Sequence, residues 1–288
     1  SCAGVVGRVR MFVRLDGTGL HGGAFASVAL RAAPGPTSLA VGEAEGRPLR
    51  LWRVERADLG VRVACGDETI DLVEHVLSAV GGLGLHQGVE VRVTGGEVPL
   101  LDGGAAEVTR ALASFGVSPV VPPLVVTRPF SLALGDAAYA IEPASLADPD
   151  RRSVSVTIDF AHPRIGRQEA RWDGDRADFL ERIAPARTFG FLRDHAALLA
   201  AGRARGVDER TLHAVVVFGE RDVEPPCVLR GEDEPARHKL LDLVGDLALY
   251  GGPPRGHVRA ERPGHRATHA FVAAALAEGA LVSRWGGA

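Results

Sequence analysis

The sequence predicts an α+β protein built from two domains of similar size. Both halves of the 288 residues contain strand-like stretches of alternating branched residues and helix-like stretches whose apolar residues recur at helical spacing. A proline-rich stretch at 116–123 (GVSPVVPP) separates the halves and is typical of a connection. Hydrophobic residues make up 46% of the chain, enough for a sizeable core. We therefore expect domains at 1–117 and 124–288, joined by a linker at 118–123.

The first half is expected to combine strands with two helices. Apolar residues of the stretch 70–80 fall on one side of a helix, and Gly81 and Gly82 end it. In chain order we expect a strand at Val5–Leu15, a strand at Ser27–Ala32, a helix at Asp71–Val80, a strand at Val89–Val93, a loop at 95–104 and a helix at Ala105–Phe115.

The second half repeats this mixture of elements. We expect strands at Leu124–Pro129, Ala138–Glu142, Ser153–Phe160 and Ala214–Phe218. Helical spacing predicts helices at Ala177–Arg182, Arg193–Ala201, Arg237–Leu249 and His269–Glu278.

Composition excludes several classes of function. The net charge is −3 and the basic residues are dispersed, so we expect no nucleic-acid partner and no binding to a membrane surface. No apolar run approaches the roughly 18 residues of a spanning helix, and the arginine-interrupted start is a poor signal peptide. Cys2, Cys65 and Cys227 are too few and too far apart for a disulfide framework, which favours the cytoplasm. The oligomeric state is not predicted.

The stretch 237–246 (RHKLLDLVGD) holds the only lysine of the chain, Lys239, among 33 basic residues. His238, Asp242 and Asp246 lie one helical turn apart and form a stripe beside the apolar face of this helix. An imidazole and a carboxylate one turn apart can bind one metal ion. A polar helix face with a chance histidine is the alternative interpretation.

The first predicted helix carries Glu74 next to His75. A glutamate beside a histidine ligand recurs in zinc hydrolases, where one residue binds the metal and the other is the general base. Alone, this pair is more often a solvated helix face. Combined with His238 and Asp242, His75 completes three protein ligands and leaves a fourth position for water, the pattern of a catalytic site.

A histidine near the last predicted helix is a candidate general acid. His265 follows Gly264, which allows close backbone approach, and an imidazolium there could protonate a leaving amine or stabilise an oxyanion. Asp246, one turn beyond Asp242, could keep it charged and oriented. A surface histidine is the alternative.

Several motifs together resemble one enzyme family. The chain is similar, nearly end to end, to the UDP-3-O-acyl-N-acetylglucosamine deacetylases, zinc amidases of bacterial lipid A synthesis. In order, the motifs are GTGLHGG at 17–23, VEH at 73–75 followed by LSA at 77–79, EVPLLDG at 97–103, IDFAHP at 158–163, ARTFGF at 186–191, the stretch 237–246, and Gly264-His265. The resemblance implies two α+β domains of like topology, with helices packed between the two sheets and the active site between the domains.

The resemblance also implies a role for each candidate site residue. Zinc would be bound by His75, His238 and Asp242. Glu74 would be the general base, His265 the general acid, Asp246 its orienting partner, and Thr188 would place a hydroxyl near the reacting carbonyl. Substrate would be contacted by Lys239, Phe160 (stacking on uracil), Phe189, His21, Asp194 and Arg262.

The activity implied is zinc-dependent hydrolysis of the N-acetyl group of a UDP-linked, 3-O-acylated amino sugar, releasing acetate. Fe²⁺ could replace zinc, because histidine and carboxylate ligands accept either ion. The chain departs from the family at Ala24, at Arg262 and in the charged turn 206–210. Two alternatives therefore stand: a diverged paralogue that deacetylates another N-acetylated sugar, and a non-catalytic binding module of the same fold. An intact Glu74 and His265 favour the enzymes.

Overall fold

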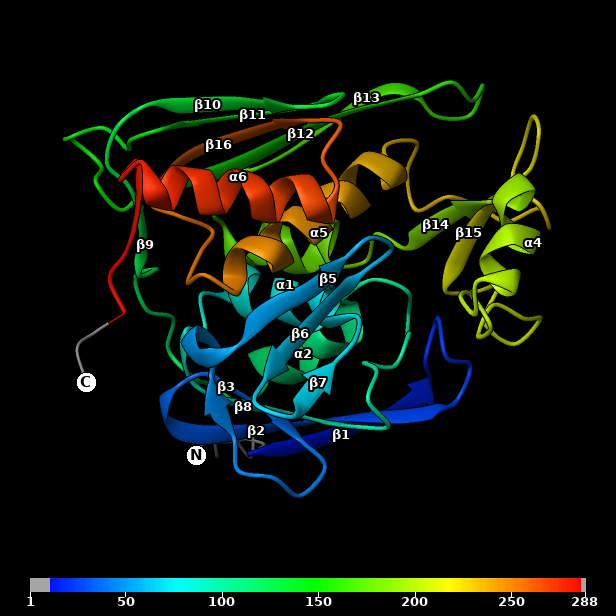
Figure 1. Cartoon of the computed structure of the whole chain (residues 1–288), viewed down its shortest axis with the longest axis horizontal. Helices are drawn as coiled ribbons and strands as arrows, with labels where there is room; N and C mark the ends of the chain where they lie inside the picture. Colours follow the sequence, from blue (N-terminus) through cyan, green and yellow to red (C-terminus); the bar gives the residue numbers. More distant parts are fainter. Residues whose placement is uncertain (1–10, 286–288) are drawn as a thin grey trace, which may run out of the picture.

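The computed structural model describes residues 11–285 and places helices between two mixed sheets (Figure 1). The sheet at the bottom of Figure 1 comes from the first half of the chain. In spatial order its strands are β1 (Phe12–Thr18), β2 (Phe25–Pro36), β8 (Gln87–Thr94), β3 (Ser38–Val41) and β4 (Arg47–Pro48).

The sheet at the top of Figure 1 comes from the second half and repeats the same pairing pattern. In spatial order its strands are β10 (Phe130–Leu134), β11 (Ala137–Glu142), β16 (Gly256–Glu261), β12 (Arg152–Phe160) and β13 (Gly166–Trp172). In both sheets the third and fourth strands run parallel and the other neighbours run antiparallel. This correspondence confirms the predicted α+β fold with two halves of like topology.

The helices between the sheets bring the two halves of the chain together. They are α1 (Val73–Leu83), α2 (Ala106–Ala113), α5 (Glu234–Ala248) and α6 (His265–Ala277). A β-carbon on Gly245 would lie only 2.0 Å from the Glu74 carbonyl oxygen, so glycine lets α5 approach the first turn of α1 directly. This contact puts the predicted Glu74-His75 pair beside the predicted His238 and Asp242 stripe.

A smaller unit projects from the side of the molecule, at the right of Figure 1. It consists of β14 (Thr188–Phe191), α4 (Leu192–Ala200) and β15 (Val215–Phe218), with β14 and β15 parallel. Its loop returns to the first half of the chain, where the Gly206 amide donates to the Leu20 carbonyl. The unit therefore spans from the second half to the first and encloses space between them.

Other elements differ from the expectations. A sheet of β5 (Arg53–Ala57), β6 (Val61–Cys65) and β7 (Glu68–Ile70) was not predicted, nor was the pairing of β9 (Leu124–Val126) with β17 (Leu281–Ser283). The helix expected at 177–182 is a short α3 (Arg176–Asp178) followed by a π-helical turn at Phe179–Ile183. A 3₁₀ turn lies at Leu49–Leu51.

The boundaries of three predicted elements also shift. α5 starts at Glu234, because Pro235 is accommodated in its first turn, where no amide donor is needed. α6 starts at His265, so the candidate acid is the first residue of the helix instead of preceding it. The strand expected at Val5–Leu15 lies partly outside the described residues. We propose the segment 118–123, which forms no helix or strand, as the domain boundary. No helix of the described residues has the length and apolarity that crossing a membrane requires.

One buried histidine lies outside any candidate site. His86 is 3% exposed, packs edge-on against Trp285, and neither ring nitrogen has a hydrogen-bond partner within residues 11–285. Burial lowers the pKa of His86 to about 3, with a smaller contribution from Arg152. The folded protein must therefore keep this ring neutral at pH values where an unfolded chain would charge it.

We predict that the His86→Leu variant loses less stability at acidic pH than the wild type does. His86 binds a proton near pH 6.5 in the unfolded chain and near pH 3 in the folded protein. The free energy of unfolding is therefore unaffected by His86 above pH 6.5 and falls as the pH drops from 6.5 toward 3. At pH 5 this amounts to about 2 kcal/mol. Urea unfolding at pH 8 and pH 5 should show this loss in the wild type and a smaller loss in the variant. An equal loss in both proteins would contradict it.

Candidate metal centre and active site

Two helices present a cluster of three buried side chains that can hold a metal ion. His75 is in the first turn of α1, and His238 and Asp242 are one turn apart on α5. Their ligand atoms all lie within 4.8 Å of one another. The Asp242 Oδ1 atom is 3.7 Å from His75 Nε2 and 3.5 Å from His238 Nε2. The structure thus brings together the three ligands that the sequence suggested.

The surroundings of the cluster suit a cation. Asp242 Oδ1 is buried and has no hydrogen-bond partner among the described residues, a costly arrangement unless an ion binds there. The Ala186 carbonyl is 3.0 Å from His238 Nδ1, so it accepts the ring proton and leaves Nε2 free as a ligand. The second oxygen of Asp242, Oδ2, accepts a hydrogen bond from Lys239 Nζ over 2.7 Å.

The protonation states also favour metal binding. Burial lowers the pKa of His75 to about 3 and also lowers that of His238, so both rings are neutral. Burial alone would raise the pKa of Asp242, but the Lys239 ammonium and, to a smaller degree, the charged His265 lower it below its usual range. Neutral imidazoles beside an ionised carboxylate are the forms that bind divalent cations.

Glu74 lies against this cluster. Its Oε2 atom accepts the Val61 amide over 2.9 Å, and its Oε1 atom is 3.8 Å from His265 Nε2. Burial raises the pKa of Glu74 to about 7. A carboxylate that exchanges its proton near neutral pH is suited to general base catalysis. Leu72, the N-cap of α1 two residues before Glu74, has a left-handed backbone (φ 61°), a strained conformation for leucine that places the helix start here.

His265 lies on the other side of Asp242. Its Nδ1 donates to both oxygens of Asp246, over 3.0 Å and 2.9 Å, and its Nε2 is 3.8 Å from Asp242 Oδ2. Burial alone would lower the pKa of His265, but Asp246 and the other carboxylates raise it to about 9. A charged imidazole facing the cluster can give up a proton from Nε2.

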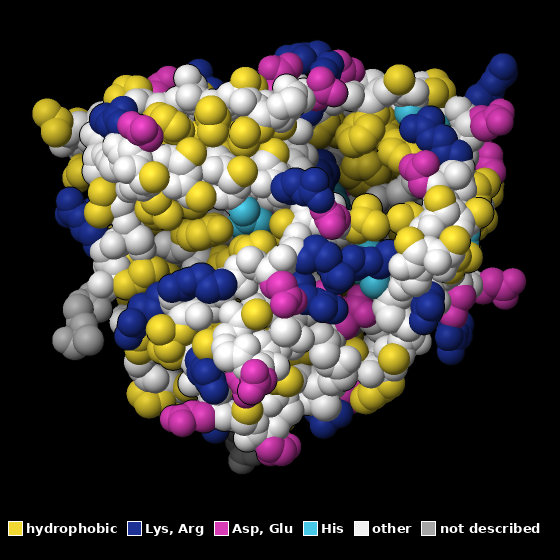
Figure 2. All heavy atoms as spheres, viewed as in Figure 1, with side chains coloured by type: hydrophobic (Ala, Val, Ile, Leu, Met, Phe, Trp, Pro, Cys, Tyr) yellow, Lys and Arg dark blue, Asp and Glu magenta, His cyan; other side chains and the backbone are white. Residues whose placement is uncertain are grey.

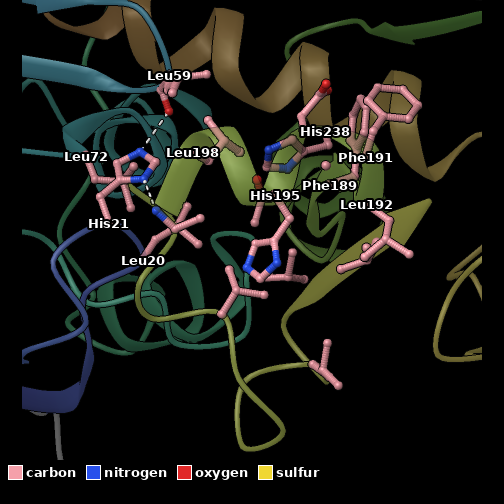
Figure 3. Close-up of a pocket in the computed structure, with 18 of the residues that line it drawn as sticks. Leu20, His21, Leu59, Leu72, Phe189, Phe191, Leu192, His195, Leu198 and His238 are labelled. Carbon is pink, nitrogen blue, oxygen red and sulfur yellow. Dashed lines mark hydrogen bonds between the residues drawn. The ribbon is translucent and has the colours of Figure 1, made fainter. Parts of the chain in front are cut away.

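A pocket of about 670 Å³ opens beside the cluster, and residues of both halves of the chain line it. Figure 3 shows one end of it at His238, Phe189 and Phe191, another at His21 and Leu59, and the His195 ring between them. Figure 2 shows a hollow lined by hydrophobic side chains between the upper sheet and the β14–α4–β15 unit. The pocket can therefore take a ligand that is partly apolar.

Most of the expected substrate contacts line this pocket. The predicted residues among its walls are Glu74, His238, Asp242, His265, Thr188, Lys239, Phe160, Phe189, His21 and Asp194. Both ring nitrogens of His21 face backbone groups, the Leu59 carbonyl at 3.0 Å and the Ala204 amide at 3.4 Å. Arg262 instead pairs with Asp159 over 2.7 Å and lies with His265 on a neighbouring hollow.

Some residues that shape the site were not singled out from the sequence. Glu97 accepts the amides of His21 and Gly22 and so fixes the turn after β1. Arg187 and Glu234 form a buried ion pair next to Ala186 and Thr188. His195 puts a polar ring among apolar pocket walls. Glu97 and Arg187 lie inside quoted motifs, whereas nothing in the sequence pattern marks Glu234 or His195.

Comparison with known proteins identifies the family. The sequence model of the family described as UDP-3-O-acyl N-acetylglycosamine deacetylase matches residues 8–277. The chain belongs to this family. The match spans the helices of both His75 and His238, and it confirms the resemblance found in the sequence.

Individual relatives of the family are similar over most of their length. The UDP-3-O-acyl-N-acetylglucosamine deacetylase of Myxococcus xanthus (strain DK1622) is 37% identical over 267 residues, 90% of this chain and 82% of that protein. The enzyme of the same name from Anaeromyxobacter dehalogenans (strain 2CP-C) is 38% identical, covering 92% and 85%. That of Synechocystis sp. is 36% identical, covering 80% and 82%.

Proposed function

We propose that this chain removes the acetyl group from the 2-amino group of UDP-3-O-acyl-N-acetylglucosamine, a step of lipid A biosynthesis. The observation that carries the proposal is the convergence of three metal-binding side chains, the carboxylate of Glu74 and the imidazole of His265 beside one apolar pocket. Membership of the deacetylase family supports the same reaction.

We propose zinc as the metal of the cluster formed by His75, His238 and Asp242, with Fe²⁺ as the alternative. Two imidazoles and one carboxylate suit either ion, and three protein ligands leave one position open. When bound, the ion would lower the pKa of a water molecule and polarise the acetyl carbonyl.

Protein side chains would supply the proton transfers. Glu74, buried and 3.8 Å from His265, would take a proton from the attacking water. His265, held charged by Asp246, would donate a proton from Nε2 to the sugar nitrogen as the bond between that nitrogen and the acetyl carbon breaks. The overall products are acetate and the protonated amine, so atoms and charges balance without a further reactant. Passing the proton from Glu74 to His265 would return both groups to their starting states.

The pocket walls suggest how the rest of the substrate binds. Apolar residues of the pocket, among them Leu20, Leu198 and Val217, would cover the acyl chain, where each buried CH₂ contributes about 0.8 kcal/mol. Lys239 and Thr188 would contact the sugar near the reacting carbonyl, and Phe160 would stack on uracil. Asp208 and Glu209 also line the pocket, which favours a shorter acyl chain than a fully apolar passage would take.

Acetate release tests this function against both alternatives. The protein is incubated with UDP-N-acetylglucosamine and with 3-O-acylated forms of increasing chain length, each with and without a chelator. We expect release that requires both the acyl chain and the metal. Release that ignores the acyl chain would favour the diverged paralogue, and tight binding of the acylated substrate without release would favour the binding module.

We predict that His238→Ala loses the metal. The variant removes one of three ligands, and elemental analysis after dialysis should show strongly reduced zinc relative to the wild type. His257→Ala is a matched control, because His257 lies on β16 with its Nδ1 against Ser153 and outside the pocket. Full metal content in His238→Ala would refute the proposed ligand set.

A further inference from the structure

A chain of polar side chains continues behind the proposed general acid, away from the pocket. Asp246 lies in the last turn of α5, and Tyr250 lies two residues beyond the end of that helix. His265 and His269 are one turn apart on α6, so each of them can face one of these two residues. His265 Nδ1 donates to Asp246, and His269 Nδ1 is 3.0 Å from Tyr250 Oη. Neither His269 nor Tyr250 lines the pocket.

The second histidine also faces Asp246. His269 Nε2 is 3.6 Å from Asp246 Oδ1, too long for a hydrogen bond but close for an N–H dipole against a charge. This nitrogen is buried and has no hydrogen-bond partner among the residues that the structure describes. Asp246 and His269 are 3% and 8% exposed, so water does not screen the contact.

These contacts determine where the proton of His269 lies. Burial lowers the pKa of His269, so its ring is neutral near pH 7 and carries one N–H. Burial also raises the pKa of Tyr250 to about 12, so its hydroxyl keeps a proton to donate to Nδ1. The ring proton then lies on Nε2, toward the Asp246 carboxylate. The opposite tautomer would put a lone pair against that negative charge.

We propose that His269, its tautomer fixed by Tyr250, is a positioning residue that holds the Asp246 carboxylate in the orientation that His265 needs. His265 Nδ1 contacts both Asp246 oxygens almost equally, so this contact alone leaves the carboxylate free to rotate about its Cβ–Cγ bond. The N–H of His269 lies beside one of these oxygens, Oδ1, and therefore opposes rotation of the carboxylate about this bond. This role rests on the proposed function, in which His265 donates a proton.

The tautomer can be measured without any assay of activity. Nitrogen NMR of the metal-loaded protein labelled with ¹⁵N-histidine distinguishes the two neutral tautomers and the charged ring, and His269→Leu identifies the signal. We expect His269 to be neutral at pH 7 with its proton on Nε2. A proton on Nδ1, or a charged ring, would overturn the proposal even if the enzyme is an active deacetylase.

Kinetics then test whether the contact orients His265. His269→Leu should lower kcat roughly tenfold, at the lower end of the effects of removing a group that orients another side chain, with KM and zinc content unchanged. His269→Gln puts an amide N–H near the original Nε2 and should recover most of the rate. His257→Leu, a histidine removed from outside the site, should leave kcat unchanged. Equal losses in the Leu and Gln variants would show a packing effect and contradict the proposal.

Tyr250→Phe removes the hydroxyl that contacts His269, with minimal change of shape, and so tests the contact farthest from His265. We expect a smaller loss of kcat, and no further loss when it is added to His269→Leu, because both changes act through one contact. Additive losses would contradict a linked chain. If the wild type released no acetate, the proposed function would fail, while the NMR measurement would still decide the His269 contact.

Discussion

Replacing Glu74 with glutamine should lower the kcat of acetate release by roughly two to four orders of magnitude, the range of general acid–base catalysis. Glutamine keeps the shape of the side chain and an oxygen that can accept the Val61 amide, so the fold and the metal should be retained. It cannot take a proton from water. Zinc content, unfolding in urea and steady-state kinetics, measured on the same preparation, separate these effects.

A half-buried glutamate outside the site provides the control for this experiment. Burial also raises the pKa of Glu107, which lies on α2 outside the pocket, so Glu107→Gln removes a carboxylate with a raised pKa without touching the site. We expect its kcat to equal that of the wild type. A near-normal kcat in Glu74→Gln with zinc bound would remove Glu74 as the general base.

The sequence could predict the parts of the site that lie on regular helices. The spacing of His238 and Asp242 places them on one helix face, and the structure shows both side chains in one buried cluster. Glu74 and His75 are likewise neighbours on a helix whose apolar pattern is clear. No local pattern predicts that these two helices touch. That expectation came from combining their candidate ligands into one metal site and from the resemblance. The physical cause, the close approach that Gly245 permits, involves residues far apart in the chain.

Other features depend on contacts that local patterns do not encode. The strand β5 alternates charged with apolar residues only weakly and becomes a strand by pairing with β6. His265 was expected before the last helix, which was predicted to begin at His269, whereas the helix begins at His265 with Gly264 as its N-cap. The contact between His269 and Asp246 joins two helices and has no signature in either one.

Replacing Arg187 with methionine should destabilise the protein by about 3–5 kcal/mol, the cost of leaving a buried charge without its partner. Arg187 Nε and Nη2 bind the two oxygens of Glu234 over 2.8 Å and 3.0 Å, and the two side chains are 6% and 1% exposed. The change removes the only side-chain cation that binds this carboxylate within residues 11–285. Urea unfolding at pH 7.5 measures the effect.

Two comparison variants show whether the buried charge causes the loss. Arg14→Met breaks an ion pair that is 51% exposed on both sides and should cost less than about 1 kcal/mol. Adding Glu234→Gln to Arg187→Met removes the stranded charge and keeps one oxygen to accept one of the two backbone amides, of residues 187 and 230, that bind Glu234. This double variant should recover part of the stability. A loss in Arg187→Met as small as that in Arg14→Met would show that Glu234 is not held by this pair.

The same ion pair should influence the metal site, because it fixes the segment that orients His238. Arg187 follows Ala186, whose carbonyl accepts the His238 ring proton, and Glu234 begins the helix that carries His238 and Asp242. Under conditions where Arg187→Met remains folded, we expect its zinc affinity to fall by roughly 10- to 100-fold, as for other groups that orient a ligand. Competition with a zinc-binding dye measures this. An unchanged affinity in the folded variant would show that the Ala186 carbonyl keeps its place without the ion pair.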